Sequence, residues 1–492
     1  MESSLQSRVS TGISGLDEVL GGGLIAGRTY LLSGPPGGGK TTLGWHFLTA
    51  GAEAGEAGLF LTFSETERDL RANAQTSGFA TEAIRVCDMS PSSEIFARIQ
   101  SYDIFSAAEV ELEPITTKLR EAIEREVPAR IFIDSITALR YLARDGSEFR
   151  RQTLSLLRFL QERGGTIVIT SEASGEAPDD DLRFLCDGVI ELAPSGRSRS
   201  LEVLKCRGSG SRAGKHTLRL DAAGAKVFPR LMPETFAKPF APGVLSWGVA
   251  ELDAMSGGGM ERGTVTILTG PSGVGKTTVG AQFVKAAAER GERSTLYTFD
   301  ERAETILARC ESVAIPARAM SERGTLSIVA IEALQFSPDE FANLVRDDVE
   351  HNGTRIIVID SISGYQLSVS GEELNERLHA LCRYLQNVGV TVLLVNETAT
   401  LSDSRITEIG LSYLADNVVV MLYVEHAENG TVEVGRAIGI LKKRLSDFEK
   451  TLRSFEITAN GLEIGDPLSH LGGLLGERRT GERRSGEPAG RT

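Results

Sequence analysis

Cysteine and histidine are scarce in this sequence and stand at irregular intervals. The 492 residues include five cysteines and six histidines. The cysteines are Cys87, Cys186, Cys206, Cys310 and Cys382, and no two of them form a CxxC pair. This spacing argues against a disulfide framework and against a structural zinc site, and the scattered histidines form no recognisable metal pair. The sequence therefore favours chemistry that needs no protein-bound transition metal.

Long apolar runs and an excess of positive charge are also missing. The longest apolar run, Val418 to Val424, is too short to span a bilayer, and Met1 to Gly12 lacks the apolar core of a signal peptide. We therefore expect a cytoplasmic protein that does not enter a membrane. With 53 Lys and Arg against 67 Asp and Glu, the net charge of −14 repels phosphate backbones and anionic lipid. Binding to nucleic acid is not expected without a local basic patch.

The sequence does contain an internal repeat. The segment Gly12–Gly23, GISGLDEVLGGG, returns 236 residues later as Gly248–Gly259, GVAELDAMSGGG. Each copy precedes a glycine-rich loop by the same distance, which indicates two homologous domains in tandem. We predict a first domain at 1–228, a proline-rich linker at 229–243, a second domain at 244–465 and a disordered tail at 466–492.

Each half alternates short apolar runs with longer amphipathic stretches such as Phe149–Arg163. The apolar runs of the first half are Thr29–Ser33, Gly58–Phe63, Arg130–Ile133 and Thr166–Ile169. This alternation predicts an α/β fold in which each domain has a mostly parallel, twisted sheet with flanking helices. The close spacing of Gly188–Leu192 and Ser200–Lys205 predicts an antiparallel hairpin at the end of the first domain.

Two glycine-rich loops match the phosphate-binding pattern GxxxxGK[ST], each after an apolar strand and before a helical pattern. Successive backbone N–H groups of such a loop point at phosphate oxygens, and the helix amino end adds positive charge. A purely structural glycine turn is the alternative, and the repeated context makes it less favoured. The predicted ATP-binding residues are Gly34, Pro36, Gly37, Gly38, Gly39, Lys40, Thr41 and Thr42, followed by Gly270, Ser272, Gly273, Val274, Gly275, Lys276, Thr277 and Thr278.

Acidic residues at strand ends complete the predicted catalytic groups. Asp134 and Asp360 end apolar runs, and we predict that they hold Mg²⁺ together with the hydroxyls of Thr41 and Thr277. The acids that would orient or deprotonate the attacking nucleophile are Glu65, Asp300 and Glu301, while Lys40 and Lys276 neutralise phosphate charge. Taken singly, these acids could also be strand-end caps, helix caps or solvated turn residues.

This combination of motifs resembles the KaiC family of RecA-like P-loop ATPases, and the resemblance extends from the entry segments to about Gly465. It implies two tandem RecA-like domains in a two-tier hexamer, with ATP bound between subunits. It also implies that a Lys and an Arg of the neighbouring subunit reach each triphosphate. The matching positions are Lys205 and Arg207 in LKCRG, and Lys442 and Arg444 in LKKRL. Without the resemblance, these cations would be read as ordinary exposed charge on a hairpin.

The resemblance further implies a serine/threonine autokinase in the second domain. The position that matches the family's phosphorylated pair is Ser412-Tyr413, so serine is present and tyrosine replaces threonine. The family also has two adjacent glutamates at the catalytic turn, and Ser64-Glu65 keeps only one of them. A KaiB-like partner is implied, but the tail matches nothing in the family, so circadian timing does not follow from the sequence.

Three functions are therefore open at this point. The first is an ATP-hydrolysing, self-phosphorylating oligomeric switch of the clock type. The second is a RecA-like recombinase or helicase, against which stand the net charge and the absence of a basic segment rich in aromatic residues. The third is a nucleotide-gated scaffold with little turnover, which the single carboxylate at Glu65 keeps open.

Overall fold

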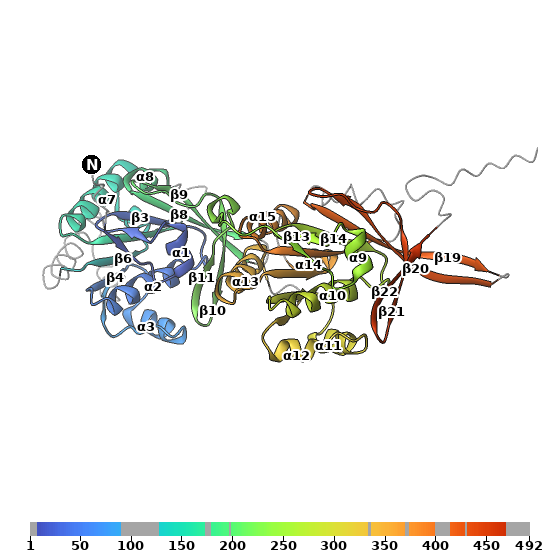
Figure 1. The fold of residues 1–492 in the computed structure, drawn as a ribbon. Coiled ribbons are helices and arrows are strands. Elements are labelled where there is room, and N and C mark those ends of the chain that lie inside the picture. The colour runs from blue at the N-terminus through green and yellow to red at the C-terminus, as the bar shows by residue number, and fades with distance from the viewer. Residues whose placement is uncertain are drawn as a thin grey trace, which may run out of the picture. The chain divides into compact units, whose positions relative to one another are not determined.

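The computed structural model describes residues 7–89, 127–172, 179–195, 198–332, 336–369, 373–398, 414–428 and 431–468. The chain divides into two compact units, Met1–Arg230 and Leu231–Thr492, which are coloured blue to green and green to red in Figure 1. Ser412 and Tyr413 lie outside the described residues.

The first unit is built on a nine-stranded sheet of order β11-β10-β9-β8-β3-β7-β6-β4-β5. The six strands from β8 to β5 in this order pair in parallel, and β8, β9, β10 and β11 pair antiparallel. A small sheet of β1 (Arg8–Val9) and β2 (Leu24–Ile25) lies beside it. The strands of the large sheet are β3 (Thr29–Ser33), β4 (Gly58–Thr62), β5 (Ile84–Asp88), β6 (Arg130–Asp134), β7 (Thr166–Ser171), β8 (Gly188–Ser195), β9 (Ser198–Cys206), β10 (Lys215–Asp221) and β11 (Gly224–Phe228).

Helices cover both faces of this sheet (Figure 1). One hydrophobic cluster joins the sheet to α1 (Ser14–Val19), α2 (Lys40–Glu53) and α3 (Glu67–Thr76). A second cluster joins the other face to α6 (Ala138–Leu142), α7 (Gly146–Gln161) and α8 (Asp180–Leu185). The start of α7 is set locally, because the Asp145 side chain accepts a hydrogen bond from the Glu148 N–H. Most residues of the parallel strands are buried, as expected for a sheet covered on both sides.

Phe132 is the centre of the packing between α2 and the sheet. Its side chain is fully buried on β6, and the Phe60 ring stands edge-on to it with the centroids 5.1 Å apart. Gly44 of α2 approaches so closely that an added Cβ would lie 2.2 Å from Phe132 Cζ. Glycine at this position therefore lets the helix that follows the first glycine-rich loop rest directly on the sheet.

The second unit repeats this architecture with a sheet of order β16-β15-β17-β18-β14-β19-β20-β21-β22. Strands β16 to β19 in this order are parallel, and β19 to β22 are antiparallel. The strands are β14 (Val265–Gly270), β15 (Ser294–Thr298), β16 (Leu326–Ala330), β17 (Ile356–Asp360), β18 (Thr391–Glu397), β19 (Asn417–Glu428), β20 (Thr431–Lys443), β21 (Arg453–Thr458) and β22 (Gly461–Pro467), with β12 (Val244–Leu245) and β13 (Met260–Glu261) in a small separate sheet.

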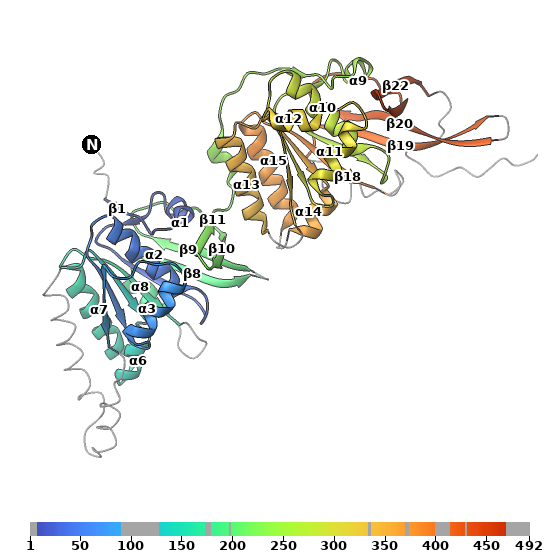
Figure 2. The same cartoon turned by 90° about the horizontal axis from the view of Figure 1, so that it is seen from below.

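The helices of the second unit again lie on both faces of the sheet. One cluster includes α9 (Ala250–Met255), α10 (Lys276–Glu289), α11 (Ala303–Glu311) and α12 (Ala317–Glu322). The other includes α13 (Pro338–His351), α14 (Ile362–Ser368) and α15 (Leu374–Asn387). A capping box of Ser337 and Glu340 starts α13. The long strands β19 and β20 reach beyond the rest of their sheet (Figure 2). These two sheets confirm the predicted α/β fold, including the antiparallel strands at the end of each.

The proline-rich segment packs on the second unit. Pro233–Phe236 forms a short 3-10 helix, and the Asn387 amide of α15 donates to the Pro233 carbonyl at 2.9 Å. The Phe236 ring stands edge-on to Tyr384 of the same helix. At the other end, β22 continues through Pro467, so its last two residues lie inside the segment that the sequence predicts to be a disordered tail. Residues 469–492 lie outside the described part of the chain.

No helix in the described ranges is long and apolar enough to cross a membrane.

Protonation of His46 should weaken the first unit at acidic pH. Its Nε2 accepts a hydrogen bond from the Ala225 N–H of β11 at 2.8 Å. Burial lowers the pKa of His46 below its ordinary value of 6.5, and a backbone hydrogen bond with Gly12 opposes part of that effect. Because the folded state favours the neutral ring, its stabilising contribution is complete above about pH 6.5. The contribution is lost as the pH falls through the lower pKa of the folded protein.

Urea unfolding of the wild type and of His46→Gln, between about pH 5 and pH 8, measures this effect. Glutamine keeps an acceptor for the Ala225 N–H but does not titrate, so the free energy of unfolding should fall more steeply with acid in the wild type. Equal slopes for the two proteins would mean that other groups carry the pH dependence.

Candidate functional site

The first glycine-rich loop joins the central strand β3 to α2. Gly39, the last residue before the helix, has a left-handed backbone with a φ of 100°. A Cβ at this position would lie 2.7 Å from Leu220 Cδ1, a side-chain end that can move, so the left-handed conformation is the main reason for glycine here. The amino end of α2 thus meets the carboxyl end of β3, an arrangement that binds phosphate. The loop and the first turn of α2 contain the predicted residues Gly34, Pro36, Gly37, Gly38, Gly39, Lys40, Thr41 and Thr42.

Lys40 is a buried cation at the start of α2. The residue is 6% exposed, and its Nζ donates to the carbonyl oxygens of Gly34 at 2.7 Å and Pro35 at 3.0 Å. Burial lowers the pKa of Lys40, and the negative charge of Glu172 opposes that shift. Since an ammonium group has three N–H donors, two of them hold the side chain against the loop and one is left for an anion.

Thr41 and Asp134 meet at the carboxyl edge of the sheet. Thr41 Oγ1 donates to Asp134 Oδ2 at 2.6 Å. Thr170 of β7, the strand between β3 and β6, donates to Asp134 Oδ1, also at 2.6 Å. Both carboxylate oxygens are therefore held in place. A hydroxyl beside a carboxylate is an oxygen donor set that suits Mg²⁺.

The second loop repeats this geometry between β14 and α10. Gly275 has a φ of 112°, and Lys276 Nζ donates to the carbonyl oxygens of Gly270 at 2.8 Å and Pro271 at 2.7 Å. Burial lowers the pKa of Lys276 as it does that of the first lysine. The Val274 side chain is fully buried, so this residue can offer a ligand only its backbone. The predicted residues Gly270, Ser272, Gly273, Val274, Gly275, Lys276, Thr277 and Thr278 all lie in the loop or in the first turn of α10.

Thr277 and Asp360 form the second hydroxyl and carboxylate pair. Thr277 Oγ1 donates to Asp360 Oδ2 at 2.6 Å. Burial raises the pKa of the Asp360 carboxyl, the hydrogen bond from Thr277 opposes this, and the negative charges of Glu301 and Asp300 raise it further. The acid at this strand end therefore lies among other carboxylates and would gain from a cation.

Glu65 lies in the turn between β4 and α3. The Glu65 N–H donates to Thr62 Oγ1 at 3.1 Å, which fixes the turn, and the Asn73 amide donates to Glu65 Oε2 at 3.4 Å. The residue is partly exposed. Its carboxylate thus has a weak neutral contact and access to water.

Asp300 and Glu301 occupy the same turn in the second unit, and each carboxylate has a partner. Ser361 Oγ donates to Asp300 Oδ2 at 3.0 Å. The Arg309 guanidinium of α11 forms an ion pair with Glu301 Oε2. The two units therefore place their predicted bases in different electrostatic surroundings.

Lys205 and Arg207 lie away from the loop of their own unit. Lys205 pairs with Val189 in the β8–β9 ladder, and the Arg207 N–H donates to the Asp187 carbonyl at the amino end of β8. The loop follows the carboxyl end of the neighbouring strand β3, so these cations lie toward the opposite end of the sheet. Lys205 Nζ donates to the Arg183 and Cys186 carbonyl oxygens, both at 2.7 Å.

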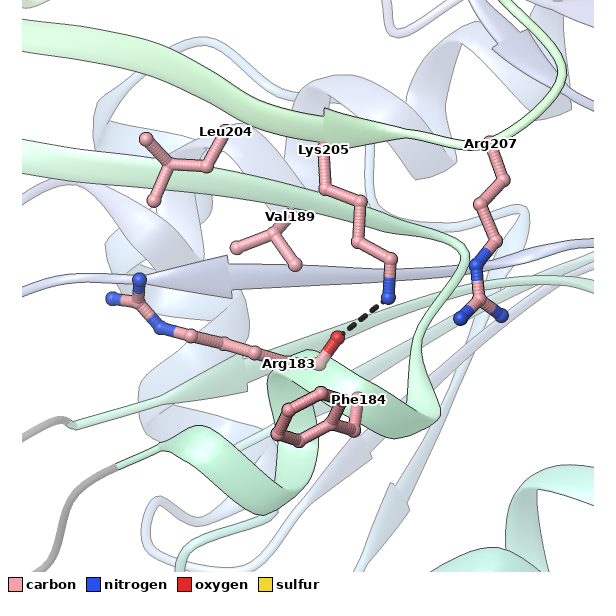
Figure 3. Close-up of a pocket in the computed structure, with 6 residues that line it drawn as sticks. All are labelled: Arg183, Phe184, Val189, Leu204, Lys205 and Arg207. Atoms are coloured by element: carbon pink, nitrogen blue, oxygen red, sulfur yellow. Dashed lines mark hydrogen bonds between the residues drawn. The ribbon is translucent and has the colours of Figure 1, made fainter.

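These cations line a surface cavity of about 350 Å³, which Figure 3 shows. Phe184, 68% exposed, and Leu204, 42% exposed, are apolar parts of its wall. Burial lowers the pKa of Lys205, and the neighbouring charge of Arg207 lowers it further. The cavity thus combines cationic and apolar groups on one surface of the first unit.

Lys442 and Arg444 have the equivalent placement in the second unit. Lys442 pairs with Val418 in the β19–β20 ladder and donates to the Ala415 carbonyl at 2.7 Å. Arg444 lies 3.4 Å from the carboxylate of Asp416, before the amino end of β19. Neither cation lies at the loop Gly270–Thr277 of its own unit.

Several side chains at these sites were not predicted from the sequence. Asp179 is 3% exposed and accepts hydrogen bonds from Ser33 and Ser171 beside the first loop. Two hairpin residues contact the loops themselves, because Arg199 Nε donates to the Gly37 carbonyl at 3.2 Å and Tyr423 Oη donates to the Ser272 carbonyl at 3.4 Å. Comparison of the repeats would have indicated Asn73 and Arg309, since both stand eight residues after the retained glutamate.

Two phosphate-binding loops at the centres of two mostly parallel sheets, each with an aspartate on the next strand but one, define a tandem RecA-like P-loop nucleotide-binding protein. The chain belongs to the KaiC ATPase family. The family model described as "ATPase: KaiC" matches residues 9–232 and again residues 245–469.

Similar proteins cover nearly the whole chain. The circadian clock oscillator protein KaiC of Parasynechococcus marenigrum is 28% identical over 480 residues, which are 94% of this chain and 91% of that protein. The protein of the same name from Synechococcus elongatus is 28% identical and covers 94% of this chain and 90% of its own length. The circadian clock protein KaiC3 of a Synechocystis species is 26% identical over 95% of this chain and 94% of its own.

Proposed function

We propose that this protein is an oligomeric, ATP-driven switch of the clock type, with ATP hydrolysis in the first domain and serine autophosphorylation in the second. The observation that carries the proposal is the repeated set of a buried lysine, a threonine and a strand-end aspartate, with the same 2.6 Å hydroxyl to carboxylate contact in both units. The domain limits in this proposal are 1–228 and 244–465. The family match supports this function over the recombinase and scaffold alternatives.

At each loop, the backbone N–H groups and the lysine would bind the β- and γ-phosphates of ATP. Loop carbonyls already hold Lys40 and Lys276 in place. Little side-chain entropy would therefore be lost when each ammonium group binds the phosphates. Thr41 with Asp134, and Thr277 with Asp360, would hold Mg²⁺. This ion, when bound, neutralises charge on the phosphate oxygens.

Glu65 is the proposed base of the first site. Its carboxylate lies at the turn after β4, beside the strand that ends in Asp134, and its contact with Asn73 is neutral. A carboxylate in this place would orient the attacking water and accept its proton. Asp300 and Glu301 have the corresponding role in the second site, where the nucleophile is the hydroxyl of Ser412. Absence of phosphate on Ser412 after incubation with Mg-ATP would contradict the kinase part of the proposal.

Assembly would complete the sites. Lys205 with Arg207, and Lys442 with Arg444, lie away from the loops of their own units, which supports a role at the triphosphate of a neighbouring subunit in a hexamer. Such cations stabilise charge on the γ-phosphate and make activity depend on assembly. A monomeric mass by light scattering in saturating ATP would contradict this. A KaiB-like partner and a cytoplasmic location remain predictions, and the first of these is tested by an ATP-dependent pull-down.

Replacement of Glu65 by glutamine tests the hydrolytic part of the proposal. In a Lys276→Ala background, where only the first site can act, Glu65→Gln should lower kcat by roughly 100-fold or more, because glutamine keeps the size of the side chain but removes the base. Binding of ATP should be retained, since the hydrogen bonds of Glu65 within the described residues are with Thr62 and Asn73. Phosphate release and fluorescent ATP-analogue binding are the two measurements.

The matched control for this variant is Glu67→Gln, two residues further along the chain at the start of α3. Glu67 pairs with Arg71 on the surface of α3, 2.8 Å away, and should not affect turnover. Turnover of Glu65→Gln equal to that of its background would remove Glu65 from the mechanism and favour a scaffold with little turnover.

A further inference from the structure

One pair of equivalent residues differs in charge at the two candidate active sites. The repeats place Glu65 opposite Glu301 and Asn73 opposite Arg309, with the same offset of 236 residues. Asn73 lies on α3 and Arg309 on α11, the helices that follow the catalytic turns. Each reaches back to the glutamate, so the two units share the contact but not its chemistry.

The first contact is weak and neutral, and the second is a direct ion pair. The Asn73 amide donates to Glu65 Oε2 at 3.4 Å, near the limit for a hydrogen bond. In contrast, the Arg309 guanidinium is paired with Glu301 Oε2. A carboxylate oxygen that is bound to a guanidinium is a weaker proton acceptor and is less free to orient a nucleophile.

The other acid of the second turn is also restrained. Asp300 Oδ2 accepts a hydrogen bond from Ser361 at 3.0 Å, whereas the first unit has Ser64 at the equivalent of Asp300. The second site therefore has two carboxylates with partners, where the first has one carboxylate with a loose contact.

A structural role is the alternative explanation for Arg309. The charges of Glu301 and Asp300 raise the pKa of the Asp360 carboxyl, and the charge of Arg309 lowers it. Arg309 could therefore serve only to relieve the repulsion between these carboxylates. However, the side chains of Arg309 and Glu301 are 35% and 34% exposed, and an ion pair with this exposure adds little stability. The effect of Arg309 on the chemistry of Glu301 is therefore expected to be larger than its effect on stability.

We propose that Arg309 is a positioning residue that restrains Glu301 and makes the second site a slower ATP hydrolase than the first. This inference rests on the proposed function of Glu301 as the group that activates the nucleophile. A site that hydrolyses its bound ATP slowly is suited to transfer of the γ-phosphoryl group to a protein hydroxyl. In that transfer the hydroxyl oxygen forms the new P–O bond, the bond to ADP breaks, and the hydroxyl proton passes to the carboxylate of Asp300, the other proposed acid of this turn.

The experiment compares steady-state hydrolysis by the full-length Lys40→Ala protein with and without Arg309→Asn, which copies the first site. We expect kcat to rise by roughly two- to fivefold with KM for ATP unchanged, since the ion-pair partner of Arg309 is Glu301 and not a residue of the phosphate loop. Arg309→Lys keeps a cation and should give less than half of that increase. The reciprocal change, Asn73→Arg in the Lys276→Ala protein, should lower first-site kcat by a similar factor.

A matched control is Arg318→Asn. This variant removes an exposed ion pair, 2.7 Å long, with Glu304 of α11 and should leave kcat unchanged. A purely structural Arg309 would lower the melting temperature and kcat together on replacement. The inference is overturned if kcat falls or stays unchanged in Arg309→Asn and does not fall in Asn73→Arg. If Glu301→Gln in the Lys40→Ala protein also leaves kcat unchanged, the proposed function of Glu301 fails as well, and the two failures are thus distinguished.

Discussion

Lys40→Ala is expected to lower ATP hydrolysis at the first site by about two to three orders of magnitude, and Lys276→Ala to abolish labelling of the protein by the γ-phosphate of ATP. Each lysine is buried and already held by two loop carbonyls, so its charge is pre-positioned for the phosphates. Loss of one such pre-positioned group commonly costs a factor of this size. Phosphate release and protein-bound phosphate, followed together, measure both effects, with peptide mapping at Ser412.

A surface lysine provides the control for this prediction. Lys226 forms an exposed pair with Asp221, 3.5 Å away, on β11 and β10 of the first unit, and Lys226→Ala should change neither signal. The reverse assignment, with labelling lost in Lys40→Ala and release lost in Lys276→Ala, would contradict the proposed division between the domains. Release without any labelling in the wild type would leave an ATP-driven switch without a kinase.

Phe132→Ala is expected to destabilise the first unit by about 3–5 kcal/mol, the usual cost of emptying a fully buried phenylalanine site. The ring fills the space that Gly44 leaves between α2 and β6 and stacks edge-on with Phe60. Because α2 begins with Lys40, the loss of packing should also weaken nucleotide binding. Thermal and urea unfolding of the full-length protein, with and without ATP, provide the measurement.

The control for this variant is Val127→Ala, since Val127 lies in the same unit and is 62% exposed. Its free energy of unfolding should stay close to that of the wild type. A similar, small change for both variants would mean that α2 relaxes onto the sheet and fills the cavity.

Much of the fold was predictable because buried parallel strands have a strong local signature. Thr29–Ser33 was predicted with both of its ends correct, and the predicted starts of the other three apolar runs, at Gly58, Arg130 and Thr166, were also correct. The loops, the lysines and the strand-end aspartates were predictable for the same reason, since their spacing along the chain fixes their geometry. The contact of Thr41 with Asp134 follows once β6 is placed near β3.

Other features depend on contacts that no local pattern specifies. Thr170 touches Asp134 because β7 lies between β3 and β6, and that strand order is a property of the whole sheet. Asp179 lies on a connecting segment, where no periodicity marks a buried acid. Arg309 was missed because an arginine on a half-exposed helix is ordinarily a surface residue, and only its equivalence to Asn73 sets it apart.

The close approach of Gly44 to Phe132 has a thermodynamic consequence. In the proposed function the amino end of α2 binds phosphate, and the same helix packs into the hydrophobic core along its length. Nucleotide affinity and the folding free energy of this unit would then be linked. A ligand at 100 times its Kd adds about 2.7 kcal/mol to the stability of the state that binds it. Under the proposed function, ATP bound at this loop would therefore stabilise the folded first unit as well as serve as its substrate.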